Sequence, residues 1–533
     1  MGFLVLLSLL SIFILFIIHI HKTKSRTSSI PPPGPKPLPI IGNLHQIDPS
    51  LPHHSLWQLS KHYGPIMSLH LGYIPTLVVS SSKMAKEVMQ THDLKFSSRP
   101  SLLGLRKLSY NCLDLAFAPY SSYWKEMKKH CVVNLFSTQR VHSFRPIREN
   151  EVAQLIQKLS QYDGDEKGVN LSETMMSFTN TLICKIALGK KYFFDYEEEV
   201  ELGSEQRRSR LKILLNETQA LLTEFYFSDH FPLLGWVDRI KGTLWRLDKT
   251  FKELDLIYQR VIDDHMDNLR RPKSKEQEVV DIIDILLQMM NDHSLSFELT
   301  LDHIKALLMQ EMLLAMFPWT QVLIKALVQN IFIGGTDTST ATVVWAMTVL
   351  MNNPRVMNKV QMEIRNLYEN KDFINEDDIE KLPYLKSVVK ETLRLFPPTP
   401  LLLPRETIQN CNIDGYEIIP KTLVYVNAWA IGRDPENWED PEEFYPERFF
   451  MSSVDFEGNN FELIPFGSGR RMCPGIKMGV RTVELSLANL VHSFEWKLPN
   501  GFDKDQVLDT QVKPGIIMHK KIDLYLVPRK RKP

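Results

Sequence analysis

Apolar residues along most of this chain repeat with the period of an α-helix. They recur every three or four positions, the spacing that lines one face of a helix. The clearest segments are residues 147–162, 211–225, 248–268, 279–291 and 354–367. Asn353 followed by Pro354 is a typical helix start, a capping side chain before a proline in the first turn. The chain is therefore predicted to be mainly helical.

Two shorter stretches have the pattern of β-strands. Residues 64–81 contain two partly alternating runs around the turn-forming residues 72–75, which predicts a hairpin. A second β-rich stretch covers residues 411–431. Because no linker divides the chain after its N-terminal hinge, the predicted fold class is mainly α with small β-sheets in one globular body.

The N-terminus has a different pattern. Residues 3–20 are apolar apart from two serines and His19, and as a helix they would span about 27 Å, close to the thickness of a thin bilayer. Basic residues follow at 22, 24 and 26 and none precedes, which is unlike a cleavable signal peptide. We predict an uncleaved anchor at 1–22, a basic flank and proline-rich hinge at 23–44, and a cytosolic domain at 45–533.

Charge and cysteine content exclude several classes of protein. Lys plus Arg and Asp plus Glu both number 63, so no overall field favours a nucleic-acid partner. The 5 cysteines are widely spread and form no CxxC pair, which argues against a zinc knuckle or a disulfide framework. A reducing compartment fits this usage best.

One cysteine lies in an unusual loop, "PFGSGRRMCPG", at residues 465–475. Cys473 occupies the position of a helix N-cap with Pro474 at the first helical position, and a helix N-terminus lowers the pKa of a thiol. The three glycines would let the backbone lie against a flat object, and Arg471 could meet an anionic group. Together these features suit haem, with sulfur on the iron and arginine on a propionate.

Other interpretations of this loop stay open at this point. A cysteine in a glycine-rich loop is more often structural than functional. A nucleophilic cysteine would need a nearby histidine base, which sequence does not reveal. A phosphate-binding loop is disfavoured, since no strand precedes the loop and no GK[ST] or third glycine follows in the required place.

The loop resembles the haem-binding signature of the cytochrome P-450 superfamily, on residues Phe466, Gly469, Arg471, Cys473 and Gly475. Further motifs occur in the family's order over nearly the whole chain. The anchor and the hinge resemble the start of a microsomal plant member of the A-type clan. The remaining motifs are "YWKEMKK" at 123–129, "GGTDTS" at 334–339, "ETLR" at 391–394 and "PERF" at 446–449.

The resemblance implies roles for individual residues. Asp337 and Thr338 would be the acid–alcohol pair that delivers protons during oxygen activation, on a helix whose two glycines allow a close approach. Contacts to the haem propionates would come from a set of four residues. These are Trp124, Lys128, where the family usually has arginine, Arg405 and Arg471.

The resemblance also implies a structural cluster. Glu391 and Arg394 lie three positions apart and so share one face of a helix that must end near Phe396, since prolines follow. Arg448 would complete a buried group that holds the haem-binding side together. An exposed pair at this spacing would contribute little.

The implied activity is a membrane-anchored haem-thiolate monooxygenase. Haem b with an axial cysteine thiolate would be the cofactor, and NADPH would act indirectly through an NADPH–cytochrome reductase, with a cytochrome b-type donor as a further partner. The catalytic domain would face the cytosol from the endoplasmic reticulum membrane. Mostly apolar segments at 102–118, 222–231, 399–403 and 515–517, with Phe117, Leu401 and Leu402 among them, predict a hydrophobic or aromatic small-molecule substrate.

Two alternative functions are compatible with parts of the sequence. A haem-thiolate isomerase or dehydratase on the same fold would usually lack the acid–alcohol pair. A haem-binding or membrane-tethered protein without activity is the second alternative.

That second alternative is suggested by residues 310–329, which interrupt the family pattern before the oxygen-activating helix and repeat part of the preceding sequence. A single helix over 299–351 would be about 80 Å long, against a body roughly 60 Å across. Because Pro318 also lacks a helical N–H, the sequence predicts a break near residues 317–319. The upstream piece is expected to be displaced outward, with Leu313, Leu314, Phe317 and Trp319 either exposed or lying on the membrane.

Overall fold

The computed structural model describes residues 30–189, 204–270, 281–291, 313–501 and 503–531. The predicted anchor at 1–22 lies outside these residues. Within the described ranges, no helix has both the length and the apolar character needed to cross a bilayer.

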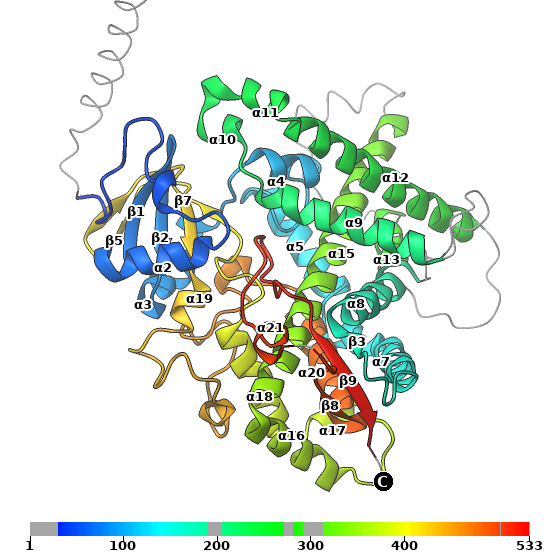
Figure 1. Ribbon diagram of the computed structural model, residues 1–533. Helices are drawn as coiled ribbons and strands as arrows, with labels where there is room; N and C mark the ends of the chain where they lie inside the picture. Colours follow the sequence, from blue (N-terminus) through cyan, green and yellow to red (C-terminus); the bar gives the residue numbers. More distant parts are fainter. Residues whose placement is uncertain (1–29, 190–203, 271–280, 292–312, 502, 532–533) are drawn as a thin grey trace, which may run out of the picture.

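Helices make up most of the body (Figure 1). The longer ones are α2 (Pro52–Tyr63), α5 (Ser122–Asn134), α7 (Arg145–Ser160), α8 (Leu171–Leu188), α9 (Ser204–Thr223), α12 (Thr243–Arg270), α13 (Ile282–Asn291), α15 (Leu313–Asn352), α16 (Pro354–Leu367), α18 (Pro383–Leu395) and α20 (Ile476–Ser493). The shorter ones are α3 (Ser82–Lys86), α4 (Leu103–Leu108), α6 (Thr138–Ser143), α10 (Phe227–His230), α11 (Trp236–Ile240), α17 (Glu376–Ile379), α19 (Ala428–Ile431) and α21 (Lys504–Val507).

Three small sheets complete the fold. The four-stranded sheet has the order β1-β2-β7-β4 and is built from β1 (Ile66–Leu71), β2 (Ile74–Val79), β7 (Leu423–Val426) and β4 (Arg405–Glu406). Strands β1 and β2 form the predicted hairpin, and β2 pairs in parallel with β7. The other sheets are β3-β9-β8, from β3 (Val169–Asn170), β9 (Tyr525–Lys530) and β8 (Phe494–Lys497), and β5-β6, from β5 (Cys411–Ile413) and β6 (Tyr416–Ile418).

The predicted fold class of mainly α with small sheets is confirmed. All five segments predicted from periodicity are helical, as α7, α9, α12, α13 and α16. Asn353 does precede α16, but its side chain makes no capping bond and instead donates to the Val349 carbonyl of the preceding helix at 2.8 Å. The boundary was therefore predicted correctly, but the capping contact was not.

Helix α15 runs through the centre of the body and packs against α8, α20 and α18 (Figure 1). It continues through Pro318, so the predicted break near residues 317–319 is wrong. Pro318 lies in the second turn of α15, where the missing hydrogen bond loosens only the end of the helix. Because α15 begins at Leu313, its length is about 60 Å, which matches a body of this size.

The end of the apparent insertion is part of the core. Six consecutive residues at 324–329, which follow the expected break, are buried. Lys325 donates to Asp255 on α12 at 2.7 Å, and Asp255 also accepts from the Tyr110 hydroxyl at 3.0 Å. The side chains at 313, 314, 317 and 319, which were expected to be exposed or on the membrane, lie outside the described part of the chain.

Candidate active site

An internal cavity of about 340 Å3 is lined by both α15 and the cysteine loop. Its walls are mainly apolar and come from segments far apart in the sequence. Residues of α5, α8 and α9 line it together with the segments around 108–117, 398–405 and 516–517. Most of the predicted substrate segments therefore meet at one place.

One predicted substrate residue lies elsewhere. Phe117 and Leu402 line the cavity, whereas Leu401 packs with Leu56, Met67 and Leu69 beneath the four-stranded sheet. The two residues lie in a turn, in which the Leu402 N–H donates to the Thr399 carbonyl at 3.0 Å and Leu402 has a positive φ of 52°, so their side chains leave the chain in different directions. Sequence composition alone does not reveal this difference.

The cysteine loop presents a thiol to the cavity. The backbone N–H of Cys473 donates to the Phe466 carbonyl at 3.0 Å, which closes the loop on itself. The ring of Phe466 packs against Phe456, with 5.4 Å between ring centres, and Phe466 also lines the cavity. The side chain of Cys473 is exposed, but it lines the cavity, so the surface it exposes lies inside the fold.

Two expectations about Cys473 are corrected. Helix α20 begins at Ile476 with Gly475 as its N-cap, so Cys473 lies two residues before the cap and Pro474 is not in the helix. Burial raises the pKa of the Cys473 thiol and outweighs the lowering effects of the Gly475 backbone N–H and the Lys128 charge. The protein alone therefore favours the thiol, and a metal ion would be needed to stabilise the thiolate.

The glycines of the loop have different roles. Gly467 adopts φ +70°, lines the cavity, and a Cβ there would meet only a Leu402 carbon at 3.8 Å. Gly469 also has φ +70°, but a Cβ there would lie 2.2 Å from the Met89 carbonyl oxygen. Gly467 thus leaves room in the cavity wall, whereas Gly469 is required for contact with another protein segment and not for a ligand.

Arg471 and Arg405 both lie beside the cavity and are buried. Arg471 donates to the carbonyls of Ser97 at 2.7 Å and Ala118 at 2.6 Å. Arg405 donates to the Ser468 carbonyl at 3.0 Å and lies 3.5 Å from a carboxylate oxygen of Asp93. Both guanidinium groups are therefore held mainly by neutral oxygens.

Arg99 is a third buried arginine in this group, and the sequence analysis missed it. It lines the cavity and donates to the carbonyls of Ala116 at 3.0 Å, Leu403 at 2.7 Å and Pro404 at 2.7 Å. In the sequence Arg99 occurs only in the tripeptide "SRP" at 98–100, which belongs to none of the motifs and has no characteristic distance from them. Only the fold brings Arg99 next to Arg405 and Arg471.

This arginine group carries more positive charge than the nearby carboxylates balance. Burial and the charge of Arg405 lower the pKa of Arg471 to about 9, and burial also lowers the pKa values of Arg99 and Arg405. The Nη1 atom of Arg471 is buried without a hydrogen-bond partner among the described residues. A ligand with negatively charged groups is expected beside these side chains.

Trp124 and Lys128 contact this group from α5. The indole of Trp124 donates to the Leu115 carbonyl at 3.0 Å, and the Arg471 guanidinium lies 3.8 Å from the ring centre. The ammonium of Lys128 donates to the Arg470 carbonyl. Both residues line the cavity, and the contacts they make here hold the cysteine loop.

The opposite wall is formed by α15. A Cβ on Gly334 would meet no atom within 4 Å, whereas one on Gly335 would lie 2.7 Å from Ile183 of α8. Thr338 lines the cavity, and its hydroxyl donates to the Gly334 carbonyl at 2.6 Å. Gly334 and Thr338 thus leave space at the cavity, and Gly335 allows α8 to pack closely.

Asp337 does not line the cavity. Its carboxylate is buried and accepts from Nε2 of Gln219 on α9 at 2.6 Å. Burial raises the pKa of Asp337 to about 6, although the Gln219 hydrogen bond lowers it. The two residues predicted as a pair are adjacent in sequence but face different surroundings.

The structural cluster forms as predicted. Glu391 receives two hydrogen bonds from Arg394, at 2.7 and 2.8 Å, and one from Arg448 at 3.0 Å. Glu391 and Arg394 are fully buried, and α18 ends at Leu395, next to the predicted Phe396. The exposed alternative is thereby excluded.

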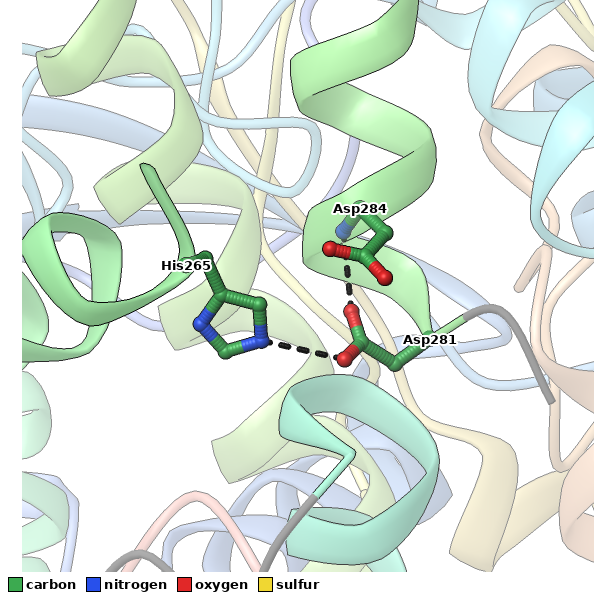
Figure 2. Close-up of side chains that lie close together, drawn as sticks. All are labelled: His265, Asp281 and Asp284. Carbon is green, nitrogen blue, oxygen red and sulfur yellow. Dashed lines mark hydrogen bonds and ion pairs between the residues drawn. The ribbon is translucent and has the colours of Figure 1, made fainter. Parts of the chain in front are cut away.

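A separate cluster of His265, Asp281 and Asp284 joins α12 to the start of α13 (Figure 2). Nδ1 of His265 lies 2.8 Å from the Val261 carbonyl, and Nε2 lies 3.0 Å from Asp281 Oδ2. Because both oxygens can only accept, the ring fits as an imidazolium that donates from both nitrogens. Burial lowers the pKa of His265, but Asp281, the Val261 carbonyl and Asp284 together outweigh burial, and the net shift is upward. The cluster is an interhelical ion pair.

An iron porphyrin fits the residues around the cavity. The Cys473 thiol can supply an axial ligand, the arginine group and its unpaired Nη1 suit carboxylate groups, and Gly467 leaves room for a flat ring. The described residues thus provide the donor set that haem-thiolate ligation requires.

Comparisons with known proteins agree with this fit. The family model for Cytochrome P450 matches residues 32–316 and 319–527. Cytochrome P450 71B37 of Arabidopsis thaliana is 45% identical over 527 residues, which cover 98% of each chain. The 6,7,8-trihydroxycoumarin synthase of Pastinaca sativa is 42% identical, over 99% of this chain and 98% of that protein.

Two further comparisons add detail. The 5-OH-xanthotoxin synthase of Pastinaca sativa is 44% identical, over 98% of this chain and 96% of that protein. A solved structure of a zebra fish cytochrome P450 with abiraterone has a TM-score of 0.69 and 23% identity, and covers 90% of this chain and 99% of that chain. This last likeness concerns the fold alone.

Proposed function

Because this chain belongs to the cytochrome P450 family, we propose that it hydroxylates a planar aromatic small molecule in plant specialised metabolism. It is an oxidoreductase of the monooxygenase type whose cofactor is haem with a cysteine thiolate, and its electrons come from an external reductase. The observation that carries the proposal is the Cys473 thiol at a cavity bordered by Arg99, Arg405 and Arg471.

These side chains have distinct tasks in holding the cofactor. Cys473 ligates the iron, and the three arginines hold the propionates. Trp124 and Lys128 position the cysteine loop through Arg471 and the Arg470 carbonyl. The bound haem supplies the oxygen-activating chemistry, and the protein controls which molecule and which protons reach it.

Proton delivery involves the opposite wall. Thr338 lies at the cavity, and its hydroxyl can pass a proton when its bond to the Gly334 carbonyl is exchanged. Asp337, whose pKa is raised to about 6, is the group from which the proton comes. Because this pair is present, we favour a monooxygenase over an isomerase or dehydratase.

The substrate class follows from the lining and from the relatives. The cavity walls are mainly apolar, which suits a hydrophobic ring system. Two relatives are named for making 6,7,8-trihydroxycoumarin and 5-OH-xanthotoxin. We therefore propose a coumarin-like aromatic substrate that gains one hydroxyl group.

The surroundings of the enzyme are also proposed. Residues 1–22 anchor it in the endoplasmic reticulum membrane, and the domain at 45–533 lies in the cytosol. Exposed basic side chains near the cysteine loop form a surface for an acidic electron donor, either the NADPH-dependent reductase or a cytochrome b-type protein. They are Lys125, Lys129, Arg470 and Lys477.

The test combines spectroscopy with turnover. The reduced protein with CO should show the thiolate-type spectrum, and Cys473→Ala should abolish it, whereas Cys411→Ala, a buried cysteine in β5, should keep it. With reductase, NADPH and a coumarin, the wild type should form a hydroxylated product. A thiolate-type spectrum without NADPH-dependent product for a panel of aromatic compounds would contradict the monooxygenase assignment.

A further inference from the structure

Gln219 on α9 connects the cavity wall with the buried carboxyl of Asp337. Its side chain lines the cavity, as Thr338 does, whereas Asp337 itself does not. Nε2 of Gln219 lies 2.6 Å from Oδ2 of Asp337. Asp337 has no ion-pair partner among the described residues, so this amide is the polar group that faces it from a neighbouring helix.

The orientation of the amide follows from chemistry. A carboxylate can only accept hydrogen bonds, so the NH2 end of Gln219 must point to Asp337. The other end, Oε1, is buried and has no hydrogen-bond partner among the described residues. Leaving a buried amide oxygen unpaired is unfavourable, because it loses its hydrogen bonds to water without replacement. The side chain is therefore held in this orientation chiefly by its bond to Asp337.

We propose that Gln219 is a positioning residue that holds the Asp337 carboxyl outside the cavity, in the contact between α9 and α15, from where it supplies protons toward Thr338. This inference rests on the roles proposed above for Asp337 and Thr338. In each turnover Asp337 releases a proton toward the cavity and regains one from solvent, so its protonation state is restored. Gln219 itself gains and loses no proton.

The hydrogen bond also affects when Asp337 is ionised. Burial raises the pKa of Asp337, and donation from Gln219 opposes this shift because it stabilises the charged form. Without the donor, the pKa rises further and the carboxyl is free to adopt other rotamers. Both changes alter proton delivery while leaving the cysteine loop in place.

The first experiment compares Gln219→Met with a matched control. Methionine has a similar shape and no donor, and Gln157→Met makes the same change on the exposed face of α7. In the reconstituted full-length enzyme, Gln219→Met should lower product formed per NADPH about two- to tenfold and raise peroxide, the range one hydrogen bond supports. The haem content should stay unchanged, and the pH midpoint of coupling should move upward. Gln157→Met should behave as wild type.

The second experiment is a double-mutant cycle with Asp337→Asn. If Gln219 acts through Asp337, Gln219→Met should add nothing in the Asp337→Asn background. Gln219→Glu gives an independent test, because a protonated glutamate can donate to Asp337. Coupling in this variant should recover as the pH falls, whereas coupling in Gln219→Met should not.

The outcomes separate this inference from the proposed function. If Asp337→Asn uncouples the enzyme and Gln219→Met does not, or if the two effects add, the positioning role of Gln219 is wrong. If Asp337→Asn leaves coupling unchanged, the proposed role of Asp337 fails first. A loss of haem in Gln219→Met would indicate a purely structural side chain and would also overturn the inference.

Discussion

Two groups of buried arginines in this protein differ in how their charge is balanced. In the cluster around Glu391, one carboxylate accepts from Arg394 and Arg448 at 2.7–3.0 Å. In the group beside the cavity, Arg99 and Arg471 donate mainly to backbone carbonyls, and Arg405 has a carboxylate only at 3.5 Å.

The difference concerns how much of the positive charge the protein itself compensates. Both groups bear the desolvation cost of burial, but only in the Glu391 cluster does a carboxylate accept short hydrogen bonds from two arginines. Beside the cavity, Asp93 lies 3.5 Å from Arg405, and Asp114 acts on Arg99 and Arg471 without forming an ion pair with either. In the cavity group, burial and mutual repulsion lower the pKa values, which shows that the charged forms are poorly compensated by the protein alone. A cofactor with two carboxylates would supply the negative charge that Glu391 supplies to the other group.

The largest effect is expected for Glu391→Gln. It leaves Arg394 and Arg448 without their carboxylate, and breaking a buried pair typically costs about 3–5 kcal/mol. We expect little or no haem-containing protein, measured as the yield of CO-binding protein. Glu442→Gln is the comparison, because Glu442 is itself exposed and its partner Arg433 keeps its hydrogen bond to the Leu395 carbonyl at 2.7 Å; it should cost less than about 1 kcal/mol. Equal yields of Glu391→Gln and Glu442→Gln would mean that the Glu391 carboxylate is not required to stabilise its arginines, which would contradict the difference between the two groups.

Arg471→Met, unlike Glu391→Gln, should not lower the stability of the apoprotein but should weaken haem binding. Removing a poorly compensated buried cation should leave the apoprotein at least as stable in urea, while haem dissociates about 10- to 100-fold more readily, as expected for one lost charged hydrogen bond. Arg470→Met next to it, an exposed arginine paired with Asp93 at 2.8 Å, is the control and should release haem at nearly the wild-type rate. A destabilised apoprotein in Arg471→Met would place this arginine in the structural class.

A smaller effect is expected at Lys325, which is paired inside the protein with Asp255 at 2.7 Å. Because Asp255 is partly exposed, Lys325→Met should cost about 1–2 kcal/mol in urea unfolding.

Deletion of 310–329 tests the same contact in another way. Residues 304–307 repeat the sequence of 324–327, so the deletion should bring Lys305 to the position of Lys325 and keep haem content and turnover. Lys305→Met should then reproduce the loss only in the deletion variant. Reduced haem in the deletion variant itself would show that 310–329 is an integral part of the fold.

The smallest effect concerns His265. Its pKa is raised in the folded state, so the stabilisation by Asp281 is fully present below pH 6.5 and is lost as the pH rises through the raised value. Between pH 6 and pH 8.5, the apparent unfolding temperature of the wild type should fall by a few degrees more than that of His265→Gln. Identical pH dependence in both proteins would mean that the ring is not an imidazolium.

Much of the site could be predicted because its parts are local patterns. The cysteine loop, the α15 motif and the Glu391–Arg394 spacing each lie within a few residues. The Glu391–Arg394 pair has the expected form, whereas Cys473 lies before the N-cap of α20 and Asp337 does not share the surroundings of Thr338. The errors arose where long-range packing decides. A proline rule predicted a break in α15 at Pro318, but the helix continues, with its buried length packed against α8 and α20. A glycine rule treated Gly467 and Gly469 alike, although one borders the cavity and the other a protein segment.

The sequence by itself determined the helical body, the hairpin, the position of the cysteine loop and the order of the motifs, because periodicity and short spacing are properties of neighbouring residues. Only the tertiary structure brought Arg99 to Leu403, 304 positions away, and Gln219 to Asp337, 118 positions away. Such contacts depend on how helices pack across the core, and single residues without a local pattern carry no sign of them. Packing likewise decides how the charge of each buried arginine is balanced, because it sets which arginines lie next to a carboxylate and which lie next to backbone carbonyls at the cavity.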